Sequence, residues 1–144
     1  MKAVVFQGPG QVQVEERPKP QMSESTDALV RVTTGAICGT DLHFYHGRAP
    51  MEPGFVLGHE FVGTAEEVGP GVKRFQTGDR VLGSFVSACG MCWFCRRGML
   101  HKCTGARIFG CGYAFGDLAG SQAEYVLVPN ADFMPRDGED DYIG

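Results

Sequence analysis

The sequence lacks a long hydrophobic run. The apolar run near its N-terminus is A-V-V-F, which is shorter than the core of about 7–15 residues that a signal peptide needs. Nothing later approaches the ~20 apolar residues of a transmembrane helix. We therefore expect a cytoplasmic chain without a membrane-spanning segment. In that compartment its six cysteines are expected to bind metal or react, because structural disulfides are rare there.

The sequence also lacks a stretch rich in basic residues. The formal net charge is −4, and the 13 lysines and arginines form no run that could contact phosphates. We therefore expect no nucleic-acid partner. A length of 144 residues suits one domain with a real core. The hydrophobic content of 43% and the charged content of 21% are ordinary for a soluble globular protein.

Long helical periodicity is missing as well. The 21 glycines and 8 prolines indicate many tight turns, and the segments between them read as short strands: residues 2–6, 11–16, 27–34, 55–65, 78–86 and 122–128. Alternation in residues 11–16 predicts one buried face. Residues 42–46 are expected to form one or two helical turns with Thr40 or Asp41 near the N-cap. About seven short strands favour an all-β barrel or sandwich.

Four cysteines dominate residues 87–107, which have little regular pattern. Their spacing is C-x2-C-x2-C-x7-C, and they are Cys89, Cys92, Cys95 and Cys103. Four thiolates so close in sequence can surround a tetrahedral zinc with no open position, and such a closed site is structural. We predict that a structural zinc substitutes for a hydrophobic core in this four-cysteine lobe.

Two other interpretations of the lobe were weighed. Disulfides would require an oxidising compartment. An iron–sulfur cluster is possible because bacterial ferredoxins begin C-x2-C-x2-C, but their fourth cysteine follows after three residues and precedes a proline. Here seven residues intervene and Thr104 follows, which favours zinc. We expect Cys111 to be a small buried residue, and His101 to be exposed.

A second concentration of chemically active side chains lies in residues 35–60. A catalytic zinc takes three protein ligands and leaves one position open. Cys38 and His59, with twenty residues between them, suit two loops that converge at a barrel end. The working hypothesis is that these two residues hold a catalytic zinc, and that Thr40 and His43 move a proton away from it.

Each of these residues also has a plainer interpretation. Thr40 alone suits a helix N-cap, and His43 and His46 suit exposed helix positions. Glu60 could be the partner of a buried arginine, and Phe85 could be simple core.

The motifs taken together resemble a known family. G-A-I-C-G-T-D-L-H, G-H-E, G-P-G-V, G-D-R-V and the four-cysteine motif occur in the order and rough spacing of the zinc-dependent medium-chain alcohol dehydrogenases. The resemblance runs from Lys2 to about Pro135. It implies their N-terminal GroES-like catalytic domain, a partly open β-barrel with short helices and a four-cysteine zinc lobe. Residues 116–126 are most similar to the branch of threonine and glutathione-independent formaldehyde dehydrogenases.

The resemblance implies ligands for the catalytic zinc. Cys38 and His59 match the first two, and Glu60 matches a carboxylate that can exchange in as a ligand. Asp41 matches the carboxylate that orients the zinc histidine, as ligating imidazoles generally require. Phe85 matches an aromatic residue that lines the substrate pocket.

The resemblance also implies a reaction. Thr40 matches the hydroxyl that takes the substrate's proton, and His43 matches the base that passes it on through the cofactor ribose, so both would also contact the cofactor. The implied chemistry is hydride transfer from a zinc-bound alkoxide to NAD or NADP. The substrate would be a small alcohol or aldehyde, and the full-length enzyme a dimer or tetramer of one chain.

Part of the family pattern is missing. Gly39 stands where some members carry a basic residue that contacts the cofactor. No G-x-G-x-x-G turn joins a strand to a helix, because residues 110–116 lie in a β-rich stretch without a following helix pattern. We therefore expect a catalytic domain over residues 1–135 and a linker over 136–144, leading to a nucleotide-binding Rossmann domain outside these residues.

The family's third zinc ligand usually lies in that second half, so we expect the 144-residue chain to be inactive alone. The alternative function is a stand-alone GroES-like structural zinc-binding module without redox activity. A third possibility, an iron–sulfur electron carrier, would be coloured.

Overall fold

Eight strands and one α-helix are found in residues 1–134, the part of the chain that this computed structural model describes. The strands are β1 (Lys2–Gly8), β2 (Gln11–Glu16), β3 (Ala28–Gly35), β4 (Phe61–Val68), β5 (Arg80–Gly83), β6 (Val86–Ser87), β7 (Arg107–Ile108) and β8 (Tyr125–Val128). The helix is α1 (Gly39–Tyr45), and short 3₁₀ helices lie at Cys95–Arg97, Leu100–Lys102, Tyr113–Phe115 and Ala131–Phe133. The prediction of a mainly β fold with short helices is confirmed.

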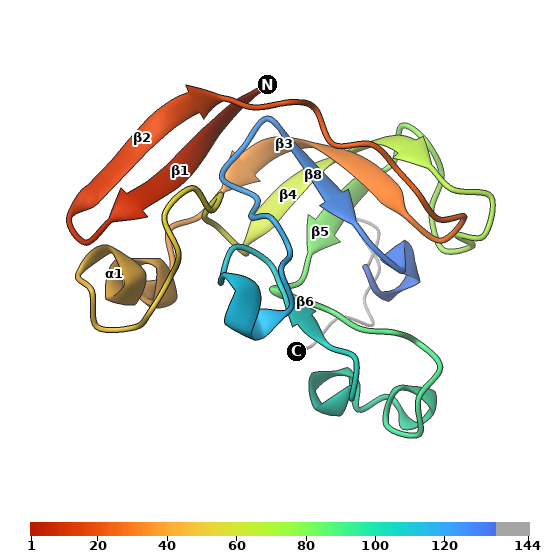
Figure 1. Cartoon of the computed structure of the whole chain (residues 1–144). Helices are drawn as coiled ribbons and strands as arrows, with labels where there is room; N and C mark the ends of the chain where they lie inside the picture. The colour runs from red at the N-terminus through yellow and green to blue at the C-terminus, as the bar shows by residue number, and fades with distance from the viewer. Residues whose placement is uncertain (135–144) are drawn as a thin grey trace.

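The strands form three antiparallel sheets. The central sheet has the order β5-β4-β3-β8, and β1 pairs with β2 and β6 with β7. Isolated bridges at Ala3↔Ala123 and Val5↔Val56 join the β1–β2 hairpin to the loops beside the central sheet. The hairpin thus closes one side of a partly open barrel, with α1 beneath its tip (Figure 1). None of the helices in the described residues is long and apolar enough to cross a membrane.

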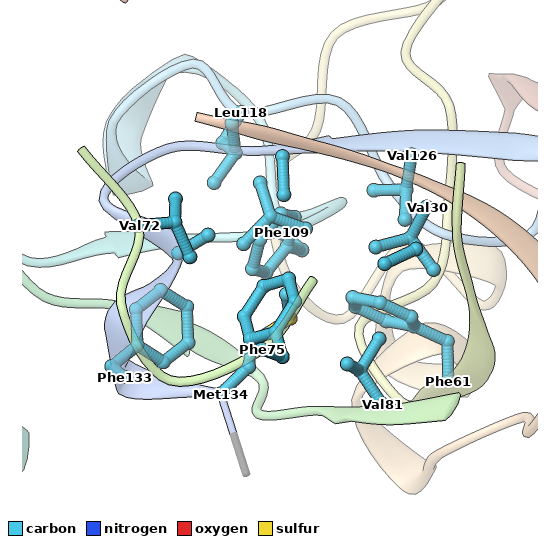
Figure 2. Close-up of a cluster of buried hydrophobic side chains, with 14 residues drawn as sticks. Val30, Phe61, Val72, Phe75, Val81, Phe109, Leu118, Val126, Phe133 and Met134 are labelled. Carbon is cyan, nitrogen blue, oxygen red and sulfur yellow. The ribbon is translucent and has the colours of Figure 1, made fainter. Parts of the chain in front are cut away.

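The core lies on one face of the central sheet (Figure 2). Successive side chains of a strand point to opposite faces, so Ala28 and Val30 of β3 share the inner face with Phe61 and Ala65 of β4. Phe109 packs edge-on against Phe61, with ring centroids 5.7 Å apart at an interplanar angle of 77°. The core is completed from later segments by Val72, Phe75, Val81, Leu118, Val126, Val128, Ala131, Phe133 and Met134.

The predicted strand over residues 55–65 is wrong in its first half. β4 begins only at Phe61, because Gly58 adopts φ +97°, outside the range of a strand. Residues 56–58 instead pair with residues 120–122: Ser121 N donates to Gly58 O at 2.9 Å and Gln122 N donates to Leu57 O at 2.8 Å.

Other strand boundaries also differ. The strand expected over residues 78–86 is two strands, β5 and β6, and the strand expected from residue 122 starts at Tyr125.

The prediction that residues 11–16 bury one face is also wrong. β2 is an edge strand that pairs only with β1, and Val12 and Val14 are 42% and 69% exposed. Alternation of apolar and polar residues identifies a strand but not whether another layer covers it.

The helix begins earlier than expected. Its N-cap is Cys38, and Asp41 is the third helical residue, so neither Thr40 nor Asp41 occupies the cap. The Asp41 carboxylate nevertheless accepts the Cys38 backbone N–H at 2.8 Å, which is the reciprocal half of a capping box.

Replacement of Phe109 by alanine is expected to lower the free energy of unfolding by about 3–5 kcal/mol. The ring is fully buried at the centre of the cluster, so its removal leaves a cavity. Phe115→Ala is the control, because this ring is 45% exposed and its loss should cost less than about 1 kcal/mol. Urea denaturation at a fixed zinc concentration measures both, and equal losses would contradict this packing.

Candidate functional site

The pairing of β3 with β4 brings the two predicted ligand loops together. Gly35 at the end of β3 pairs with Phe61 at the start of β4, and Ala36 N extends the ladder to Glu60 O at 3.1 Å. Cys38 lies three residues beyond one strand end, and His59 lies two residues before the other. Antiparallel pairing therefore places residues that are distant in sequence at one edge of the sheet.

Asp41 lies between the two loops. Its Oδ2 atom accepts the Cys38 N–H at 2.8 Å, and its Oδ1 atom lies 3.7 Å from His59 Nδ1. Both side chains are buried, at 4% and 5% exposure. Asp41 Oδ1 and His59 Nδ1 have no hydrogen-bond partner among the described residues. A buried imidazole that faces a carboxylate with one nitrogen keeps the other for a ligand, the arrangement expected of a metal-binding histidine.

Cys38, His59 and Glu60 form a set of possible metal ligands. One donor atom from each lies within 4.8 Å of the others. Their thiolate, imidazole and carboxylate groups are all donors that zinc accepts. Because Glu60 is exposed, it is not the partner of a buried arginine. The three residues therefore fit a metal, as the hypothesis requires.

A cavity of about 540 Å³ opens beside this set, which is in the size range of small-molecule sites. It is lined by Cys38, Thr40, Phe44, His59, Glu60, Gly83, Ser84, Phe85, Ile108, Cys111 and Phe115. Phe85 is 50% exposed, so it is not simple core. The mostly apolar wall with a few polar groups at one end suits a small organic substrate.

The two relay residues differ in position. Thr40 lines the cavity, and its Oγ1 lies 3.7 Å from Cys38 Sγ. His43 is exposed on α1 and does not line the cavity. Residues three apart on a helix share one face, so His43 lies one turn from Thr40 towards solvent. His46 is exposed, as expected.

Cys111 lies in the cavity wall and is buried, as predicted for a small core residue. Burial, together with the nearby charges of Asp41 and Cys38, raises the pKa of the Cys111 thiol to about 11. At neutral pH the group is therefore a neutral thiol, and a thiol is a poor metal ligand.

Sequence patterns gave no signal for several residues of this site. Ser84, Ile108, Cys111 and Phe115 join the cavity from segments without a ligand or catalytic motif, and Gln122 contacts Asp41 from the far end of the chain. The glycine-rich segment over residues 110–116 contains the three-residue 3₁₀ helix Tyr113–Phe115, which is too short for a dinucleotide-binding helix.

The four-cysteine lobe has the geometry of a metal site. Four sulfurs held about 2.3 Å from one zinc in a tetrahedron lie about 3.8 Å apart. Here Sγ of Cys95 lies 3.5 Å from Sγ of Cys92 and 4.0 Å from Sγ of Cys89. All four sulfurs, including that of Cys103, lie within 4.8 Å of one another. The lobe projects away from the central sheet (Figure 1), and His101 is exposed within it.

Backbone N–H groups favour the thiolate form of part of the set. The N–H groups of Cys95 and Thr104 lower the pKa of Cys92 to about 6. Hydrogen bonds from the backbone, led by that of Met91, lower the pKa of Cys89. Burial and the neighbouring sulfurs raise the pKa of Cys95 to about 12. The cluster of sulfurs therefore carries negative charge, and a bound cation would compensate that charge and let Cys95 ionise as well.

Comparisons with known proteins agree with this arrangement. The family described as the alcohol dehydrogenase GroES-like domain matches residues 24–137. Zinc-type alcohol dehydrogenase B of Aspergillus flavus is 48% identical over 132 residues, which are 92% of this chain and 30% of that protein.

Solved structures agree on the fold. Alcohol dehydrogenase TADH from Thermus sp. ATN1 superposes with a TM-score of 0.91 at 47% identity, covering 94% of this chain and 40% of that one. A zinc-binding dehydrogenase from Sinorhizobium meliloti 1021, solved bound to NADP, has a TM-score of 0.74 at 36% identity over 94% of this chain and 37% of its own. The chain thus spans less than half the length of these relatives.

Replacement of Cys103 by serine is expected to abolish tight zinc binding in the lobe, because a closed site loses one of its four ligands. The purified wild-type chain should retain one zinc per chain after dialysis against a weak chelator, and Cys103→Ser should retain much less. Cys111→Ala is the matched control, since it removes a buried cysteine outside the lobe and should leave that zinc in place. Metal content by mass spectrometry measures all three. Equal zinc in Cys103→Ser and the wild type would contradict the assignment.

The affinity of the lobe for zinc is expected to rise with pH between about pH 6 and about pH 8.5. Zinc binds thiolates, so binding must release the proton that Cys95 carries while its pKa is about 12. Below about pH 6 Cys92 also gains a proton, because its pKa is about 6, and affinity falls further. Competition with a chelator of known pH dependence measures the trend. An affinity independent of pH would show that protons are not displaced.

Proposed function

Because the chain belongs to the family of alcohol dehydrogenase GroES-like domains, we propose that it supplies the zinc-binding catalytic domain of an NAD(P)-dependent alcohol dehydrogenase. One observation carries the proposal. Cys38, His59 and Glu60 converge at one end of an apolar cavity that also contains the Thr40 hydroxyl. A purely structural module has no use for an incomplete ligand set that opens into a cavity.

Zinc held by Cys38 and His59 would act as a Lewis acid that lowers the pKa of a bound alcohol. The His59 ring is oriented by the Asp41 carboxylate, which lies 3.7 Å from Nδ1. Glu60 is exposed beside them and can approach or leave the metal. The three side chains therefore hold and orient the metal, while the cavity holds the substrate.

Thr40 is proposed to take the substrate's proton. Its hydroxyl both accepts and donates a hydrogen bond, so it can pass a proton without holding a charge. His43 is exposed one helical turn away, and its imidazole can pass the proton on to solvent, the usual role of a histidine in proton transfer. Phe85 and the other apolar residues of the cavity wall would exclude water from the reacting carbon.

The four-cysteine lobe is proposed to bind a second, structural zinc. It contributes no residue to the lining of the 540 Å³ cavity, and a set of four thiolates leaves no position for a substrate.

The hydride acceptor is proposed to be NAD or NADP, bound by a nucleotide-binding domain. The chains of the relatives extend well beyond the matched region and are long enough to contain such a domain. The Sinorhizobium meliloti structure holds NADP, which supports this choice of cofactor class. A third metal ligand from that domain would complete the set. We further propose a cytoplasmic homo-oligomer that acts on small alcohols or aldehydes, and we place the domain boundary near residue 135. The proposed linker, residues 136–144, lies outside the described residues.

A chimera tests the function. In it, residues 1–134 replace the equivalent part of the Thermus enzyme, whose structure superposes closely. The chimera is expected to reduce NAD⁺ or NADP⁺ in the presence of an alcohol. Thr40→Val should lower kcat by about 10²–10⁴-fold, the usual contribution of a proton-transfer group, whereas Thr40→Ser keeps a hydroxyl and should retain most activity. A folded, zinc-loaded chimera without turnover would contradict the function, and equal rates in Thr40→Val and the wild type would contradict the role of Thr40.

A further inference from the structure

Gln122 lies where three segments of the metal site meet. Its backbone N–H donates to Leu57 O at 2.8 Å, in the loop that carries His59. Its backbone carbonyl accepts the N–H of Val4, in β1, at 2.7 Å. These two hydrogen bonds fix the backbone of Gln122 in the barrel, and with it the position from which the side chain extends.

The side-chain amide connects the other two segments. Its Nε2 atom donates to Ala36 O at 3.3 Å, in the loop that carries Cys38, and to Asp41 Oδ2 at 3.3 Å, in α1. A carbonyl and an ionised carboxylate are acceptors only, so the amide nitrogen must face both of them. A glutamine is suited to this position because its NH₂ group has two donors for two acceptors.

Packing fixes the same side chain against the His59 loop. Gly58, directly before His59, adopts φ +97°, and a Cβ atom there would lie 2.5 Å from Gln122 Cγ. Only glycine allows this close approach. Gln122 thus contacts the loops of both predicted ligands and the carboxylate between them.

The hydrogen bond from Gln122 helps to set the orientation of the Asp41 carboxylate. Its Oδ2 atom accepts two hydrogen bonds, from Cys38 N at 2.8 Å and from Gln122 Nε2 at 3.3 Å. These two donors fix the plane of the carboxylate and leave Oδ1 facing His59 Nδ1 at 3.7 Å. With the Gln122 donor gone, the carboxylate could rotate about its terminal bond, a soft torsion.

We propose that Gln122 is a positioning residue of the metal site, which aims the Asp41 carboxylate at His59 so that His59 Nε2 carries the lone pair for the metal. The inference rests on the proposed function, because it assumes that His59 is a ligand. Gln122 acts through Asp41 and does not itself line the cavity.

Cobalt binding tests the inference. The chain is first loaded with one equivalent of zinc, which occupies the four-cysteine lobe, and is then titrated with Co²⁺. The charge-transfer absorption between cobalt and the Cys38 thiolate reports binding at the second site, and Cys38→Ser identifies the band. Gln122→Met keeps the length and the packing against Gly58 but removes both donors. We expect about tenfold weaker cobalt binding in this variant, the lower end of effects seen for groups behind a metal ligand.

Gln13→Met is the matched control, because Gln13 is exposed on β2 and its replacement should leave cobalt binding unchanged. Zinc retained by the lobe and the melting temperature show that each variant is folded. Equal cobalt affinity in Gln122→Met and the wild type would overturn the inference. Absence of the Cys38 band both in the wild-type chain and in the chimera, which supplies the second domain, would instead overturn the proposed metal site itself, so the two failures are distinguishable.

The tautomer of His59 provides a readout without metal. Long-range ¹H–¹⁵N NMR at about pH 8.5 shows which ring nitrogen of His59 carries the proton. We expect the Nδ1–H form to predominate in the wild type and in Gln13→Met, and the Nε2–H form to increase in Gln122→Met. An unchanged tautomer in Gln122→Met would overturn the role through Asp41, even if cobalt affinity fell.

Discussion

Antiparallel pairing of β3 with β4 is the constraint on which the candidate site depends. The pair Gly35↔Phe61 sets the two ligand loops at one sheet edge, and the capping box at the start of α1 turns Asp41 back between them. A slip of one residue would move His59 by about 3.3 Å along the strand and reverse the face of every β4 side chain. The buried side chains of β4, led by Phe61, oppose such a slip because they are part of the core.

The two groups of metal ligands depend on the fold to different degrees. The lobe draws all four sulfurs from residues 89–103, so only short loops must close, at a small loss of entropy. The Cys38–His59–Glu60 set requires β3, β4, α1 and the segment 120–122 to be in place together. It is also exposed to a cavity, which a structural site would not need. These differences agree with the structural role proposed for the first group and the catalytic role proposed for the second.

Asp41 and His59 are polar side chains buried in the protein, and burying polar groups costs stability. An unpaired polar atom in a protein interior loses about 1–3 kcal/mol of stability, and both Asp41 Oδ1 and His59 Nδ1 are buried without a hydrogen bond among the described residues. Donors to Oδ2 from Cys38 and Gln122 compensate part of the loss for Asp41. A bound metal would draw the ring and the carboxylate into one hydrogen-bonded unit. These two buried polar atoms thus agree with His59 as a metal ligand that Asp41 orients.

Local sequence patterns alone determined the four-cysteine ligand set, most of the strands and the short helix, because each depends on spacing within a few residues. Cys38, His59 and Glu60 were also found from the sequence, although through the resemblance of whole motifs and not through spacing. Three expectations about the elements failed. Residues 56–58 bond to residues 120–122 instead of continuing β4, β2 has no layer over Val12 and Val14, and Cys38 caps the helix in place of Thr40. Gln122 belongs to no ligand or catalytic motif, and only the tertiary structure places it against Asp41, because hydrogen bonds between residues 81 positions apart leave no periodic trace in the chain.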